Sequence, residues 1–124
     1  MSRLLINGNT VEILDTGVSL YKQPMYMFQY DYAAEWSPFK MPDGTTGTLA
    51  LDMTLDCTYC IDYEEDDEYV LIDDVKINKI VSKNPIYQDY FDKHAEEVRE
   101  TLLNTFSKNH SVSAYIFRNI RLER

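Results

Sequence analysis

An unbroken two-residue alternation from Thr48 to Tyr63 constrains the fold of this chain more than any other feature. One parity is apolar and comprises Leu49, Leu51, Met53, Leu55, Cys57, Tyr59, Ile61 and Tyr63. The other parity is mostly polar. Successive side chains of a strand point to opposite faces, so the pattern predicts one long strand with a buried face and a wet face.

A second alternating segment follows the acidic stretch and predicts the returning arm of a long hairpin. Its apolar positions are Tyr69, Leu71, Val75, Ile77 and Val81. The sequence EEDD, residues 64–67, would then form the tip. Asp73 and Lys79 interrupt the alternation, which predicts a β-bulge or a strand end at these points.

The first half of the chain also favours strands. Asn7-Gly8, flanked by apolar runs, is a strong signal for a tight hairpin turn. The aromatic-rich segment 21–36 predicts a third strand, with Pro24 at its edge. Two prolines and two glycines within residues 37–47 predict an exposed connection.

The spacing of apolar residues changes at Asn84-Pro85. Asn84 suits a helix N-cap and Pro85 suits the first helical position. Steps of three and four residues follow, at Tyr87, Phe91, His94, Ala95, Val98, Leu102 and Phe106. We expect one amphipathic helix over about 85–108 that stops at Asn109, and then a terminal strand within 111–122.

These elements predict an α+β fold: an antiparallel sheet of five or six strands with one long helix, about 85–108, on one face. A length of 124 residues fits a single domain spanning 1–124. The first residues lack the apolar run of a signal peptide, and no apolar stretch is long enough to cross a membrane. We expect a cytoplasmic protein with reduced thiols and no membrane association.

The charge of the chain is concentrated in one segment. Residues 52–74 hold ten acidic side chains and neither Lys nor Arg, whereas the other 11 acids and all 12 bases nearly cancel. Binding to a phosphate backbone depends on cationic neutralisation, so this surface disfavours direct contact with nucleic acid. A basic protein partner fits it better.

The two cysteines, Cys57 and Cys60, lie in the spacing Cys-x-x-Cys. In an extended strand, residues three apart point to opposite faces, and their Cα atoms are about 10 Å apart, too far for a disulfide. The helix N-terminus of a redox motif and the second cysteine pair of a structural zinc site are also absent from the sequence pattern. We expect Cys57 to be buried and Cys60 to be half-exposed.

Other chemistry is disfavoured as well. The acidic run lacks the ligand spacing of a calcium loop, although a hard-cation site stays an alternative to a solvated turn or a docking surface. His94 and His110 accompany the helix, and the nearby serines show no nucleophile-elbow pattern. We therefore expect no catalytic residues, no metal and no cofactor, so the chain is predicted not to be an enzyme.

The remaining candidates are partner-binding residues. They comprise the acidic side chains Asp62, Glu64, Glu65, Asp66, Asp67 and Glu68, and the aromatic side chains Tyr26, Phe28 and Tyr30. Tyrosine combines a large contact area with a polar group, and clustered charge accelerates the binding of a partner of opposite charge.

Three classes of function are consistent with these features. The favoured hypothesis is a small acidic protein of the inhibitor, immunity or counter-defence type, which masks a basic, nucleic-acid-binding surface of its partner. A structural subunit of an oligomer or a virion is the alternative, and an enzyme or small-ligand binder is the third. Arg118, Arg121 and Arg124 would also allow a head-to-tail contact between copies in a homo-oligomer.

Overall fold

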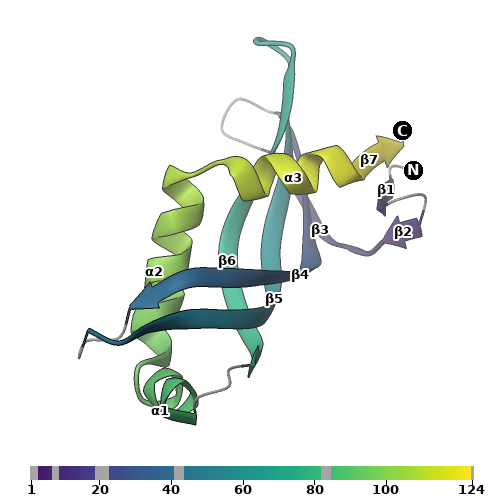
Figure 1. Cartoon of the computed structure of the whole chain (residues 1–124). Coiled ribbons are helices and arrows are strands. Elements are labelled where there is room, and N and C mark those ends of the chain that lie inside the picture. Colours follow the sequence, from purple (N-terminus) through teal and green to yellow (C-terminus); the bar gives the residue numbers. More distant parts are fainter. Residues whose placement is uncertain (1–2, 7–8, 19–22, 41–43, 82–84, 124) are drawn as a thin grey trace.

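Two antiparallel sheets and three helices form the structure, a computed structural model that describes residues 3–6, 9–18, 23–40, 44–81 and 85–123 (Figure 1). The large sheet has the order β3-β4-β5-β6, and its strands are Ile13–Val18, Pro24–Lys40, Thr46–Asp62 and Asp67–Val81. The small sheet has the order β2-β1-β7, with strands Asn9–Val11, Arg3–Ile6 and Ile120–Glu123. The helices are α1 (Pro85–Lys93), α2 (Ala95–Lys108) and α3 (Ser111–Asn119).

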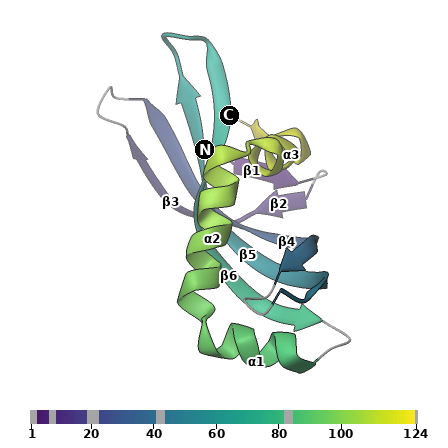
Figure 2. The ribbon, with the colours of Figure 1, turned by 60° about the vertical axis from the view of Figure 1, so that its left-hand side comes forward.

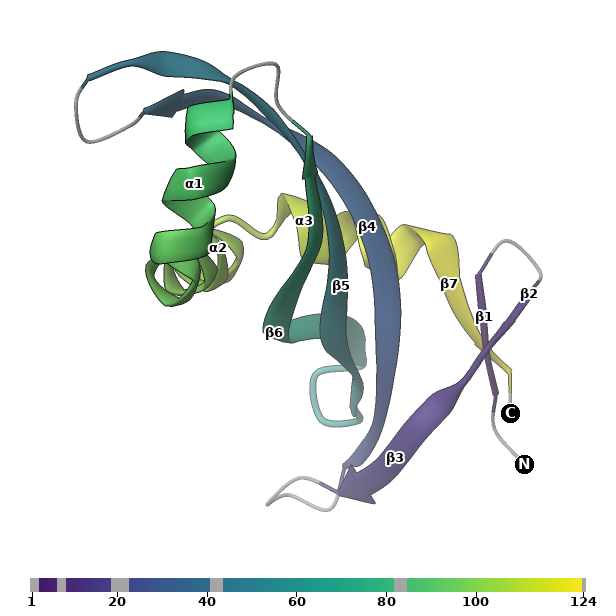
Figure 3. The same ribbon diagram turned by 90° about the horizontal axis from the view of Figure 1, so that it is seen from below.

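The core lies between the large sheet and the helices. Figure 3 shows this sheet curving around α1 and α2, while α3 runs across it toward the small sheet. The buried parity of β5 is the predicted one, from Leu49 to Ile61, and the strand register places Phe28 and Tyr30 of β4 on the same face. The helices contribute Tyr87, Phe91, Val98, Leu102, Phe106 and Ile116.

The long hairpin of β5 and β6 confirms the two predicted strands and their irregularities, but the predicted apolar face of the returning arm is only partly right. Val75 is buried, whereas Tyr69, Leu71 and Val81 are exposed and Val70 is buried instead. Asp56 pairs with Asp74 and Cys57 pairs with Ile72, so Asp73 is an extra residue in β6. A second register shift leaves Asn78 of β6 without a partner residue on β5. Asn78 is adjacent to Lys79, where the sequence predicted an irregularity. Bulges of this kind increase local twist, which is consistent with the curvature of the sheet.

The predicted single sheet and single long helix are wrong. The strands divide into sheets of four and three, and the helical region is divided at His94, which has φ −126° and ψ 32°. The backbone of His94 is still hydrogen-bonded, to Tyr90 O and from Val98 N, so no loss of bonds explains the break. A straight helix of about 36 Å could not follow a strongly curved sheet, and the bend lets both halves bury their apolar stripes.

The predicted terminal strand over 111–122 is also mostly wrong. Residues 111–119 form α3, and only Ile120–Glu123 is extended. Val112, Ile116 and Ile120 recur every four residues, and Ile116 is fully buried. Packing of this helical face outweighs the β-propensity of the segment. Asn109 ends α2 as predicted, and its side chain also accepts a hydrogen bond from Ser111 N at the start of α3.

Three predicted features, two connections and one helix cap, involve residues outside the described part of the chain. β1 and β2 pair antiparallel as predicted, but Asn7 and Gly8 lie outside the described residues. The same applies to the predicted helix cap, Asn84. The predicted connection 37–47 is shorter than expected, because β4 continues to Lys40 and β5 begins at Thr46.

Candidate protein-binding surface

The turn of the β5–β6 hairpin projects beyond α3, away from α1 and α2 (Figures 1 and 2). Asp62 and Asp67 form its last strand pair, so the turn is Tyr63–Asp66 rather than residues 64–67. One carboxylate oxygen of Asp62 accepts hydrogen bonds from the backbone N–H groups of Glu64 and Glu65, at 3.0 and 3.2 Å. Asp66 has a φ of 51°, a conformation that Asp adopts more readily than most residues.

The six acidic side chains at the turn end of the hairpin, residues 62–68, fall into two groups. Asp62 also accepts a hydrogen bond from Gln23 Nε2 at 2.9 Å, and Glu68 accepts one from the Tyr59 hydroxyl at 2.5 Å. These two carboxylates therefore stabilise the hairpin. The other four, which we call the tip carboxylates, are Glu64, Glu65, Asp66 and Asp67.

All four tip carboxylates are exposed. Within the described part of the chain, no basic side chain forms an ion pair with any of them. Like charges so close together raise the free energy of the isolated protein, and a cationic partner would relieve this repulsion. The tip carboxylates therefore form a cluster of four consecutive exposed charges that no ion pair within the described residues neutralises.

Exposed apolar side chains accompany this charge, and sequence reasoning missed them as surface residues. Tyr63 is 61 % exposed at the turn, and Leu71 is 46 % exposed on β6. Both had been assigned to apolar parities. Tyr63 follows the last residue of β5, so it no longer shares the buried face. Leu71 pairs with Thr58, on the face opposite Tyr59, because the bulge at Asp73 reverses the parity of β6. Only the strand end and the register beyond the bulge could have revealed their exposure.

A groove of about 390 Å³ lies between β6 and α3, next to the hairpin turn. Its lining comprises Glu68, Tyr69, Val70, Leu71, His110, Ser113, Ala114 and Phe117. Phe117 stacks on Tyr59 with ring centroids 6.0 Å apart, and the hydroxyl of Tyr59 in turn binds Glu68. The groove thus combines apolar side chains with a carboxylate whose position is fixed.

The predicted aromatic binding residues lie elsewhere. Phe28 is 1 % exposed and Tyr30 is 8 % exposed, and both belong to the hydrophobic core. Tyr26 is half-buried and packs against the same core. Burial, followed by the influence of Tyr115, raises the pKa of Tyr30 above its usual value. These three residues therefore do not extend the surface formed by the tip carboxylates.

Both cysteines are free, which confirms that they do not pair. Cys57 is buried as predicted, whereas Cys60 is also buried, at 6 % exposed, so its predicted half-exposure is wrong. Burial, reinforced by Asp73 and Asp56, raises the pKa of the Cys57 thiol to about 12. Burial also raises the pKa of Cys60, although a hydrogen bond with Tyr69 acts in the opposite direction. Both groups are thus protonated thiols at neutral pH, the form that is weakly nucleophilic.

The histidines have structural positions. The His94 ring stacks on Tyr90 with centroids 4.6 Å apart, and its Nδ1 lies 3.4 Å from a carboxylate oxygen of Glu97. His110 precedes α3 and lines the groove.

Within the described ranges, His, Cys, Asp and Glu side chains form no group of three or more that could hold a metal ion. None of the helices described is both long and apolar enough to cross a membrane.

Comparison with known proteins gave no match to a family model, to a curated protein sequence or to a solved structure.

Proposed function

We propose that this chain is an acidic protein-binding module that docks onto a basic surface of its partner through the projecting β5–β6 hairpin. The observation that supports this proposal is the position of the tip carboxylates. They lie at the end of a projecting turn, and no described basic side chain neutralises them. A partner that presents lysines or arginines would gain attraction there without first displacing an internal ion pair.

The groove between β6 and α3 indicates a second property that the partner should have. Electrostatic attraction raises the association rate, whereas buried apolar area slows dissociation. Leu71 of β6 and Phe117 of α3 supply apolar area in this groove, which lies next to the hairpin turn that carries the tip carboxylates. The partner that fits is therefore a basic segment with an apolar or aromatic side chain beside its cations.

Such a segment occurs on surfaces that bind nucleic acid, where cations contact phosphates. A protein that covers this surface would block nucleic-acid binding by its partner. This is the action of an inhibitor, an immunity protein or a counter-defence protein, and we propose this class for the chain. Because the tip carries only four unneutralised carboxylates, it would cover a local cationic site rather than imitate a long phosphate backbone.

The test is a pull-down from the lysate of the native host with wild type and a tip variant that combines E64Q, E65Q, D66N and D67N. Asp62 stays unchanged because its side chain holds the turn. A matched control, with E12Q, E35Q, D89N and E100Q, removes the same charge from exposed sites away from the hairpin turn. We expect a basic protein to be retained by wild type and by the control, but not by the tip variant.

Salt and assembly state provide the second readout. Binding of the retained protein should weaken as ionic strength rises, mainly through a slower association rate. Equal retention by wild type and tip variant would contradict the proposal. Retention of the chain alone, together with a mass that grows with concentration in sedimentation, would instead support a structural subunit.

A further inference from the structure

Three of the four arginines in the described part of the chain surround one cavity. Arg3, Arg118 and Arg121 line a space of about 520 Å³ at the outer face of the small sheet. Its other lining residues are Leu5, Thr10, Asn119, Ile120 and Glu123. This clustering of arginines contrasts with the net charge of −9 for the whole chain.

The register of the small sheet explains how these side chains meet. Leu5 pairs with Thr10 of β2 on one side and with Arg121 of β7 on the other. Directly opposed residues of a sheet share a face, so these three side chains lie in one row. The opposite parity includes Leu4, which is fully buried in the core. The row therefore lies on the outer face, and Arg118 joins it from the end of α3.

The arginines differ in how they are neutralised. Arg3 donates from Nε and Nη2 to one carboxylate oxygen of Glu123, at 2.9 and 2.8 Å. Arg118 and Arg121 have no ion pair with any described residue. The cavity thus presents two uncompensated guanidinium groups beside a third whose position is fixed by its partner.

Stabilisation of the α3 dipole accounts for only part of this arrangement. Arg118 lies in the last turn of α3, where a positive charge is favourable. Arg121 lies beyond the helix, on β7, and Arg3 lies on β1. A helix end therefore does not explain why all three arginines line the same cavity.

We infer that this cavity binds a small anion bearing phosphate or carboxylate groups. Guanidinium groups match the planar, two-oxygen faces of both anions and bind them more specifically than lysine does. The volume lies within the range of small-molecule sites, and Leu5 offers an apolar surface for the remainder of the ligand. This site is separate from the acidic hairpin, so the inference does not rest on the proposed function.

The test follows backbone amide chemical shifts of the full chain during titration with three probes: inorganic phosphate, pyrophosphate and citrate. We expect saturable shifts confined to residues 3–5, 10 and 118–123 at probe concentrations up to about 10 mM. Stronger binding of pyrophosphate than of citrate would identify phosphate as the recognised group. The reverse order would identify carboxylate.

Variants separate a built site from general attraction of anions. R118Q combined with R121Q should weaken binding at least about tenfold, while the exposed-lysine control K93Q with K108Q should leave it unchanged. R121K keeps the charge but loses the planar guanidinium, so it should bind more weakly than wild type. Absence of saturable shifts, or equal weakening by the lysine control, would overturn the inference. Unchanged binding by the double arginine variant would do so as well, even if its melting temperature fell.

Discussion

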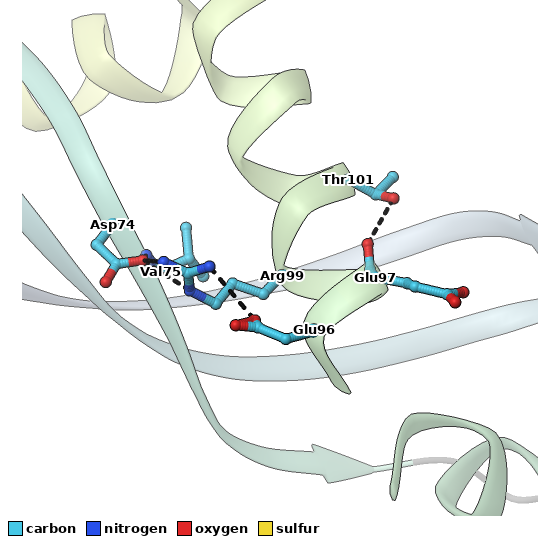
Figure 4. A network of polar contacts seen from close by, with 6 residues as sticks. All are labelled: Asp74, Val75, Glu96, Glu97, Arg99 and Thr101. Atoms are coloured by element: carbon cyan, nitrogen blue, oxygen red, sulfur yellow. Dashed lines mark hydrogen bonds and ion pairs between the residues drawn. The ribbon is translucent and has the colours of Figure 1, made fainter. Parts of the chain in front are cut away.

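Arg99 of α2 and Asp74 of β6 form a polar link between a helix and the edge of the large sheet (Figure 4). The Nε and Nη2 atoms of Arg99 lie 2.9 and 2.8 Å from the same carboxylate oxygen of Asp74. This oxygen also accepts a hydrogen bond from Val75 N at 2.8 Å, so the carboxylate connects the helix to the strand backbone.

Substitution R99Q should lower the free energy of unfolding by about 0.5–1 kcal/mol, because the pair is roughly 40 % exposed and solvent screens it. Urea denaturation would measure the change. E96Q is the control, since Glu96 lies 3.4 Å from Arg99 and is 75 % exposed. An equal loss in both variants would show that Asp74 is not the important partner.

Substitution G47A should destabilise the fold by about 1–3 kcal/mol through overpacking. A Cβ atom at position 47 would lie 2.5 Å from the hydroxyl oxygen of Tyr87, and Tyr87 is itself buried. The matched control is G17A, whose Cβ would meet only Met25 Cε at an ordinary 3.8 Å. Thermal melting of the two variants compares them directly. A G47A melting temperature equal to that of wild type would mean that α1 can move away from β5.

Substitution L55A should cost about 2–5 kcal/mol, the usual range for a large apolar side chain removed from a core. Leu55 is fully buried at the centre of β5, whereas Leu14 is 52 % exposed. L14A should therefore change the free energy of unfolding by much less. If the two losses were similar in chemical denaturation, Leu55 would not lie at the centre of the core.

Alkaline pH should destabilise the protein through Cys57. The pKa of this thiol is about 12 in the folded state and close to its ordinary value of 9.0 in the unfolded chain. Its raised pKa contributes stability that is complete below about pH 9 and is lost as pH rises toward 12. Within this window, ionisation of the thiol in the unfolded chain lowers the free energy of unfolding by roughly 1 kcal/mol per pH unit.

The variant C57A isolates this contribution. Denaturation from pH 8 to about 10.5 should show a shallower loss of stability for C57A than for wild type. Cys60 and Tyr69, whose pKa values are also raised, remain in both proteins and are not influenced by Cys57, so their contributions cancel in the comparison. Cys57 helps to raise the pKa of Tyr30, so the difference between the curves includes this coupling. Parallel curves would argue that Cys57 reaches solvent more easily than its burial implies.

The sequence predicts the β5–β6 hairpin well because alternation is a local signal. From Leu49 to Ile61 the apolar parity is the buried one, and the interruption at Asp73 coincides with a bulge. β4 is harder at its start, where Met25 and Met27 make the odd parity apolar as well. From Gln29 to Ser37 the odd positions are mostly polar, so alternation indicates that Phe28 and Tyr30 face the core, and the pairing with β5 confirms this.

The division of the helical region could not be predicted, because no local signal marks it. No residue near His94 has the chemistry of a helix breaker, and the division arises from the curvature of a sheet assembled from distant segments. Ile116 likewise fits an alternating strand as well as a helix, and tertiary packing decides between them. The projecting acidic turn could be predicted locally, but the arginine cavity required the pairing of β1 with β7.

The pairing of Arg3 with Glu123 joins positions 120 residues apart, and it has a consequence for synthesis in the cell. As the chain leaves the ribosome, β1 and β2 emerge long before β7, so one edge of β1 lacks its partner until residues 120–123 follow. Translation at about 5–20 residues per second leaves this edge open for several seconds. During that interval the nascent chain offers a strand edge to chaperones or to neighbouring chains on the same polysome.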